Sequence, residues 1–167
     1  GKSIATDLES AKDLPDIFEL VKAAVRKSTG MERGGLMLGL ADLGGGPEGL
    51  VGAFYPVATN IIVMNKSPLR RIEETDPSLY KPYAFHILLH EYLHTLGIID
   101  EDATRRKAYE ISVEIFGRNH VATRLAADLS KFIPKLVYPM YGWKPADEYR
   151  LELVRGFDRS STSSYIS

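Results

Sequence analysis

The segment from His90 to His94 constrains this chain more than any other part of it. It reads His-Glu-x-x-His and lies in a largely apolar run that starts near Pro82. Two histidines four residues apart lie on one face of a helix, one turn apart, so both imidazoles can reach a single metal ion. A helix that is apolar all round is buried, and buried ionisable groups are costly unless they are paired or bind a metal. The segment therefore predicts a buried helix that carries a metal site.

Glu91 is the candidate catalytic residue of this segment. Its carboxylate, next to the first histidine, is placed to face a water on the metal and to take its proton. Zinc (Zn2+) is the metal we expect. The chain has no cysteine, so its zinc ligands must be histidines and carboxylates.

With its continuation, the motif resembles that of the zincin metallopeptidases. His90, Glu91, His94, Gly97 and Asp100 match H-E-x-x-H-x-x-G-x-x-D, a metzincin pattern in which aspartate replaces the usual last histidine. The resemblance covers eleven residues closely. It implies a zinc metallopeptidase that acts on a peptide or protein substrate, with Glu91 as general base.

The third metal ligand has several candidates. Asp100 has the metzincin spacing, and Gly97 favours it, although aspartate is also a good N-cap for a following helix. His120 is the rival, because histidine is a good zinc ligand and a side chain at a helix start can point back across a fold. Another zincin group, the gluzincins, takes this ligand from a glutamate on a later helix, which adds Glu110 and Glu114.

Three further residues are implicated around the site. Metzincins place a methionine turn beneath the metal, and the resemblance makes Met140 the candidate for it. Tyr141, which follows, is the candidate for a tyrosine that assists catalysis. His86 lies one helical turn before His90, where it can belong to a second shell around the metal.

The apolar pattern before the motif predicts a helix and then strands. A helix is expected from an N-cap at Asp13 to Gly30. Strands are expected within residues 36–43, 50–57 and 60–65, with a hairpin loop at 44–47 and a polar connection at 67–76. The metal-binding helix is expected to begin near Ser78 and to stop by Gly97.

After the motif the chain is expected to be helical. Helices are predicted over residues 102–116, from an N-cap at Asn119 to a break at Pro134, and within 143–155. The fold expected is thus α+β: a small zincin-like domain over residues 1–158 with an N-terminal helix, a three-stranded, mostly antiparallel sheet, the active-site helix and a helical C-terminal half. Residues 159–167 are expected to form a flexible polar tail.

The bulk properties narrow the function classes. A length of 167 residues fits one domain. The net charge of -1 gives no electrostatic reason to expect nucleic acid or an anionic membrane as partner, and no stretch approaches the length of a transmembrane helix. The lack of cysteine fits a cytoplasmic protein. The chain begins with Gly1, which leaves open whether further residues precede it.

Two other functions are compatible with these residues. A zincin-like binding or latent module would keep the metal and the cleft without constitutive activity, and the tail near Tyr165 could fill the cleft of a second copy by self-association. A metal-dependent hydrolase of a non-peptide bond is the other. Bacterial ribonucleases of that kind use His-Gly-x-x-His, which would leave Glu91 without a role.

Overall fold

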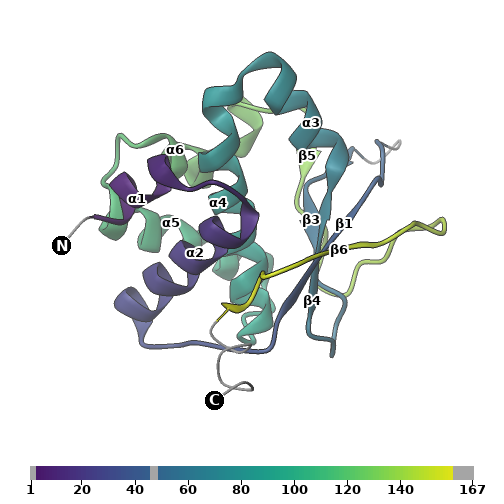
Figure 1. Cartoon of the computed structure of the whole chain (residues 1–167), viewed down its shortest axis with the longest axis horizontal. Coiled ribbons are helices and arrows are strands. Elements are labelled where there is room, and N and C mark those ends of the chain that lie inside the picture. The colour runs from purple at the N-terminus through teal and green to yellow at the C-terminus, as the bar shows by residue number, and fades with distance from the viewer. Residues whose placement is uncertain (1–2, 46–48, 160–167) are drawn as a thin grey trace.

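A mixed sheet and a group of helices on one side of it make up the fold (Figure 1). The computed structural model describes residues 3–45 and 49–159. Within them, six helices are α1 (Ile4–Ser10), α2 (Leu14–Thr29), α3 (Lys66–Thr75), α4 (Tyr80–Thr95), α5 (Glu101–Phe116) and α6 (Val121–Ala127). The strands are β1 (Met37–Ala41), β2 (Leu50–Val51), β3 (Ala53–Phe54), β4 (Ile61–Asn65), β5 (Leu136–Val137) and β6 (Glu152–Val154), and short 3-10 turns cover Pro77–Leu79 and Leu129–Lys131.

The main sheet has four strands in the order β3-β4-β1-β6. Strand β4 is antiparallel to β3 but parallel to β1, and β6 is antiparallel to β1. A second, two-stranded sheet pairs β2 with β5 in parallel. The predicted three-stranded, mostly antiparallel sheet is therefore wrong in detail, while the mixture of helices and strands and the helical C-terminal half are confirmed.

The sequence pattern also misplaced two connections. Because β1 lies beside β4 and not beside β2 or β3, residues 44–47 do not join two neighbouring strands as a hairpin. The expected polar connection at 67–76 is instead helix α3, whose N-cap Asn65 accepts a hydrogen bond from Ser67 N and whose buried face includes Leu69 and Ile72. Its many charged residues lie on the exposed side of an amphipathic helix.

Towards the C-terminus, the predicted helix within 143–155 is wrong, because strand β6 occupies its end. Helix α6 begins after His120, not after Asn119, and ends at Ala127 before the 3-10 turn. Residues 160–167 of the expected tail, and residues 46 and 47 of the expected hairpin, lie outside the described residues. Among the residues described, no helix has both the length and the apolar character needed to cross a membrane.

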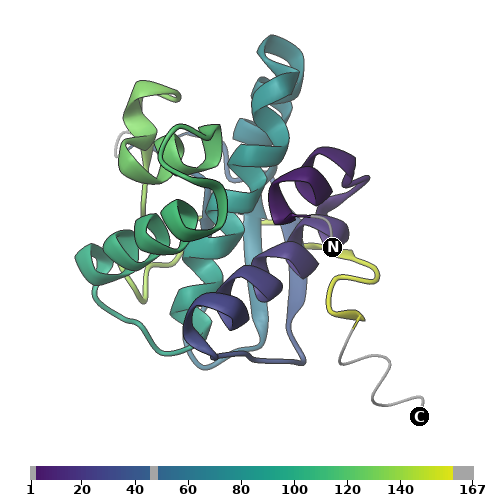
Figure 2. The same cartoon turned by 90° about the vertical axis from the view of Figure 1, so that its left-hand side faces the viewer.

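Helix α4 runs through the centre of the fold, as predicted from its apolar sequence. Residues 83–95 are all buried, and α2, α5, α6 and β3 pack around the helix (Figures 1 and 2). The helix ends where Gly97 takes a φ of 101°, in the left-handed region that glycine reaches without strain. Its ionisable side chains are thereby held inside the protein.

Arg33 connects the end of α4 to the segment after β3 by hydrogen bonds. Its guanidinium donates to the carbonyl oxygens of Thr95, at 2.8 Å, and Thr59, at 3.0 Å, and to the hydroxyl of Tyr55. The backbone N–H of Arg33 donates to the Tyr92 hydroxyl at 2.8 Å. These bonds satisfy a helix-terminal carbonyl and fix α4 relative to the segment after β3.

Gly52, between β2 and β3, is predicted to be intolerant of a side chain. A Cβ there would lie 2.8 Å from the Tyr83 hydroxyl and 3.1 Å from Ile87 Cδ1, both on α4. We expect Gly52→Ala to lower the free energy of unfolding by roughly 1–3 kcal/mol through overpacking. Urea denaturation measures this, with Gly45→Ala as control, because a Cβ at Gly45 meets only Leu50 Cδ1 at 3.8 Å. Equal stability of the two variants would contradict the close packing of α4 on this strand.

Candidate metal centre

Three buried or half-buried side chains converge at the C-terminal end of α4. The Nε2 atom of His90 lies 3.0 Å from one carboxylate oxygen of Glu101, and Nε2 of His94 lies 2.8 Å from the other. One ligand atom from each of the three residues lies within 4.8 Å of the others. This group of two imidazoles and one carboxylate can hold a metal ion.

Local structure brings these groups together. The histidines lie one turn apart on α4, and the chain turns at Gly97 before α5 begins with Glu101. Asp100 is the N-cap of α5, and its carboxylate accepts from Ala103 N at 2.8 Å. Glu101 therefore occupies the first turn of α5, where the positive end of the helix dipole favours a carboxylate.

A hydrogen bond to the backbone orients the ring of His94. Its Nδ1 lies 2.7 Å from the Ile98 carbonyl oxygen. That oxygen only accepts, so Nδ1 carries a proton and donates it, which leaves the lone pair of Nε2 available to a metal ion. Nδ1 of His90 is buried and has no hydrogen-bond partner among the described residues.

The geometry between His94 and Glu101 fits a bound cation. Nε2 of His94 and the Glu101 oxygen that it faces are both buried, and neither makes a hydrogen bond with a described residue although they are 2.8 Å apart. Ligand atoms around a tetrahedral zinc are about 3.3 Å apart, given metal–ligand distances near 2.0–2.1 Å. Each imidazole nitrogen and the carboxylate oxygen that it faces, now 3.0 Å and 2.8 Å apart, need only separate by a few tenths of an ångström to reach that spacing.

Two glutamates of the site have opposite electrostatic environments. Burial raises the pKa of Glu91 to about 8, against its usual 4.5. Burial would also raise the pKa of Glu101, but its contacts with His90 and His94 outweigh that effect and lower it to about 2. For His94, burial acts to lower the pKa, and the two carboxylates raise it overall. Glu101 is thus the anionic member of the group, and Glu91 readily holds a proton.

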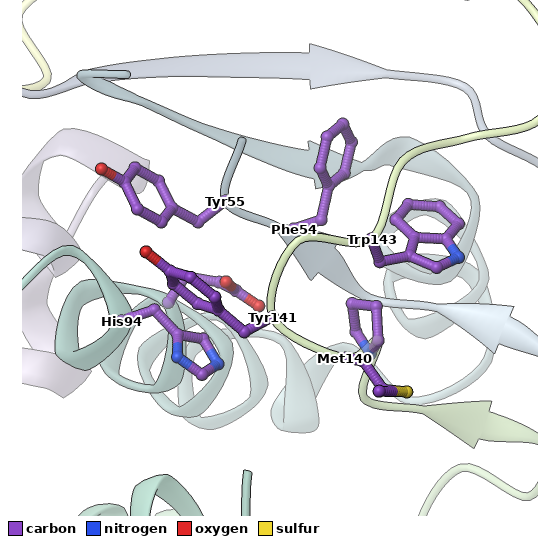
Figure 3. A pocket seen from close by; sticks show the side chains of 8 residues that line it. Phe54, Tyr55, His94, Met140, Tyr141 and Trp143 are labelled. Carbon is purple, nitrogen blue, oxygen red and sulfur yellow. The ribbon is translucent and has the colours of Figure 1, made fainter. Parts of the chain in front are cut away.

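A small cavity lies beside Glu91 and His94 (Figure 3). Its volume of about 10 Å³ leaves room for roughly one water. Half of its lining residues are Phe, Tyr or Trp, and two of these come from the segment after β5. The lining residues besides the two ionisable ones are Phe54, Tyr55, Pro139, Met140, Tyr141 and Trp143.

The residues expected as the third ligand lie elsewhere. Asp100 is used as a helix cap, directed at the backbone of α5. His120 is the N-cap of α6, where its Nδ1 accepts from Ala122 N at 3.0 Å and its ring stacks on Phe116. The glutamates at 110 and 114 are exposed on α5. Among the described residues, the carboxylate that groups with the two histidines is Glu101, because the cap at Asp100 turns the next side chain towards them.

Met140 does not lie beneath the histidines as the metzincin resemblance implies. Its side chain is 78% exposed at the rim of the cavity. Tyr141 does approach the site, with its ring centroid 5.6 Å from that of His94. His86 is buried near His90, and its Nε2 forms a hydrogen bond with the hydroxyl of Tyr138.

Sequence reasoning missed Glu101 and Tyr138. A signal for Glu101 was present: a strong N-cap at Asp100 places the next residue in the first helical turn, where acidic residues are favoured. Tyr138 had no local signal, since it reaches the site from a distant part of the chain.

The chain matches no protein-family model, and neither a curated protein nor a solved structure is detectably similar to it.

Substitution of the two neighbouring acids distinguishes the ligand from the cap. We expect Glu101→Gln to lose metal, because an amide is a poor replacement for the anionic ligand. Asp100→Ser should keep both metal and stability, because serine also caps a helix. Metal content by mass spectrometry after zinc is supplied measures the first effect, and thermal unfolding the second. Loss of metal in Asp100→Ser with retention in Glu101→Gln would reverse the assignment.

The raised pKa of Glu91 predicts a pH-dependent stability of the metal-free protein. Between pH 4.5 and about 8 the folded protein keeps a proton on Glu91 that the unfolded chain has released. Stability must therefore fall as pH rises through this interval, by roughly 1.4 kcal/mol per pH unit from this group. Urea unfolding between about pH 6.5 and 8 should show a smaller fall for Glu91→Gln than for wild type. The exposed Glu114→Gln serves as control and should behave as wild type; equal slopes in all three proteins would contradict the assignment.

Proposed function

We propose that this chain is a zinc-dependent peptidase, in which His90, His94 and Glu101 bind the metal and Glu91 is the general base. The observation that carries the proposal is the convergence of two histidine Nε2 atoms on one carboxylate, with a second, buried carboxyl group beside the cavity. The His-Glu-x-x-His sequence, which resembles that of zincins, supports the same reading.

The donor set supports zinc. Two histidines and one glutamate form one of the ligand sets of catalytic zinc sites, in which a fourth position is left for water or substrate. When bound, zinc supplies Lewis acidity, which lowers the pKa of a coordinated water and polarises a carbonyl. Glu101 contributes the negative charge that balances part of that of the ion.

The chemistry of Glu91 is proton transfer. Its carboxyl group lines the cavity, and the residue is 3% exposed. A pKa of about 8 in the buried environment means that the group holds a proton well near neutral pH. A cation bound by His90, His94 and Glu101 would favour the charged form of this neighbouring carboxyl group. The carboxylate would then accept a proton from the attacking water and return it to the leaving amine.

The sheet edge supports an extended substrate. Strand β3 is the end strand of the four-stranded sheet and contacts α4, which carries the site. An extended peptide can add to such an edge through main-chain hydrogen bonds. We therefore favour a peptide or protein substrate, and a cytoplasmic location is consistent with a chain that lacks cysteine.

The small cavity favours a second candidate, a latent form of the same site. A space of about 10 Å³ does not admit a peptide carbonyl together with its neighbouring residues. The segment 139–143 accounts for the closure: Tyr141 lies against His94, and Trp143 packs edge-on against Phe54 with ring centroids 5.2 Å apart. Substrate entry on this proposal requires the segment to move away from β3.

Glu91→Gln tests the peptidase directly. We expect the variant to retain one zinc per chain, because Glu91 is not a ligand, and to lose hydrolysis of a mixed peptide library by at least about a hundredfold, the usual scale for a general base. Product peptides detected by mass spectrometry measure the activity. Glu110→Gln is the matched control. Full activity of zinc-loaded Glu91→Gln would contradict this mechanism.

Trp143→Ala separates a latent site from an open one. Removal of the indole frees the segment 139–143 from Phe54, so a latent enzyme should become faster while its zinc content stays the same. An unchanged rate in an active protein would mean that the segment does not limit access. Zinc-loaded wild type and Trp143→Ala that both fail to cleave any peptide would argue against a peptidase.

A further inference from the structure

Tyr138 covers one face of a proposed metal ligand. It lies immediately after β5, and its ring is stacked on that of His90, with centroids 4.3 Å apart and planes at 21°. The two residues are 48 positions apart in the sequence, so the contact joins the C-terminal segment to the centre of α4. The proposed hydrolysis uses this ring neither to bind the metal nor to transfer a proton.

The two histidines are held in different ways. His94 has the usual support of a metal-binding histidine, a hydrogen bond from Nδ1 to a backbone carbonyl. For His90, no such bond exists among the described residues, since its Nδ1 is buried without a partner. Something else must restrict rotation of the His90 ring about its Cβ–Cγ bond if Nε2 is to stay directed at the metal.

Tyr138 is itself fixed by contacts on two helices. Its hydroxyl forms a hydrogen bond with Nε2 of His86, one turn before His90 on α4. The guanidinium of Arg105, on α5, lies 4.6 Å from the centroid of the tyrosine ring, a distance typical of a cation–π contact. A flat ring anchored in this way can act as a rigid wall against the imidazole.

We propose that Tyr138 is the positioning residue of His90, and that its aromatic face replaces the hydrogen bond that orients a ligand histidine. This inference rests on the proposed metal centre. The face of the ring, and not the hydroxyl, sets the orientation of His90, while the bond to His86 places the ring. Loss of the support of a ligand typically reduces metal affinity by about tenfold to a hundredfold.

The test compares metal binding in the purified wild-type chain, residues 1–167, and four variants. Tyr138→Leu and Tyr138→Met remove the flat face, with methionine keeping more of the side-chain volume. Tyr138→Phe keeps the face and removes the hydroxyl. Phe132→Leu is the control, because it removes a ring that also lies under an arginine, Arg124 at 5.3 Å, but outside the metal group.

Two measurements separate positioning from general stability. Zinc affinity by competition with a chelator should fall by about tenfold to a hundredfold in the Leu and Met variants. It should fall clearly less in Tyr138→Phe, which keeps the face and loses only the bond that places the ring, and should match wild type in Phe132→Leu. The visible absorption bands of bound Co²⁺, which report ligand geometry, should change only in the Leu and Met variants. Thermal unfolding of the metal-free proteins shows how far each substitution alters the fold itself.

The outcomes separate this inference from the proposed function. If wild type binds neither zinc nor cobalt, the metal centre and the proposed peptidase both fail. If wild type binds metal and the Leu and Met variants bind it equally tightly with unchanged spectra, the role of Tyr138 is wrong and the metal centre stands. A loss of zinc affinity in Tyr138→Phe as large as in Tyr138→Met would assign the effect to the hydroxyl and overturn the stacking argument. The comparison of these two variants remains decisive if Tyr138→Leu does not fold.

Discussion

Complete burial of α4 is the constraint on which the rest of the structure depends. A helix enclosed on all sides cannot turn its polar residues to solvent, and residues 83–95 include three histidines and a glutamate. Each of these groups must find a partner, accept a neutral state or bind a cation. Burial lowers the pKa of His86 to about 3, so this residue is neutral, while His90 and His94 face the carboxylate of Glu101. The chemistry of the site follows from how the core accommodates the ionisable side chains of this one helix.

The two carboxyl groups near the histidines show how position assigns roles. Glu101 is half-buried at a helix start and touches two imidazoles, so its charged form is favoured. Glu91 is enclosed beside an almost closed cavity and makes no such contact with the described residues, so burial favours its neutral form in the metal-free protein. Environments that push the pKa values of neighbouring acids apart are the usual means by which one site supplies both an anion and a proton carrier. The proposed division between ligand and base agrees with this pattern.

The sequence predicted those features that depend on neighbouring residues. The bounds of α2 followed from Asp13 and Gly30, and those of α4 from its apolar run and Gly97, because caps and periodicity act within a few residues. Strand pairing is not local, and nothing in the residues of β6 indicates that it will join β1. Helix α3 was not predicted, because its sequence is mostly polar and its buried face is narrow.

Within the candidate site, too, the features set by neighbouring residues were predictable and those set by distant segments were not. The two histidines and Glu91 were recognisable, because their spacing on one helix determines their geometry. The choice between Asp100 and Glu101 depended on which of two adjacent carboxylates caps α5, and one residue of shift changes the direction of the side chain by about 100° around a helix of 3.6 residues per turn. Tyr138 and the aromatic lining of the cavity come from distant segments, which spacing alone cannot bring together.

The order in which the site assembles depends on how far apart its parts lie in the sequence. The three side chains of the candidate metal centre lie within residues 90–101, on two helices joined by a short turn, so closing that loop costs little chain entropy. The walls around them come from β3 and from residues 138–143, whose contacts with α4 require much longer loops to close. Contacts between near neighbours form early in folding, and those between distant segments form late. The helix pair of α4 and α5 can therefore bring the three side chains together before the segments that line the cavity have packed against α4.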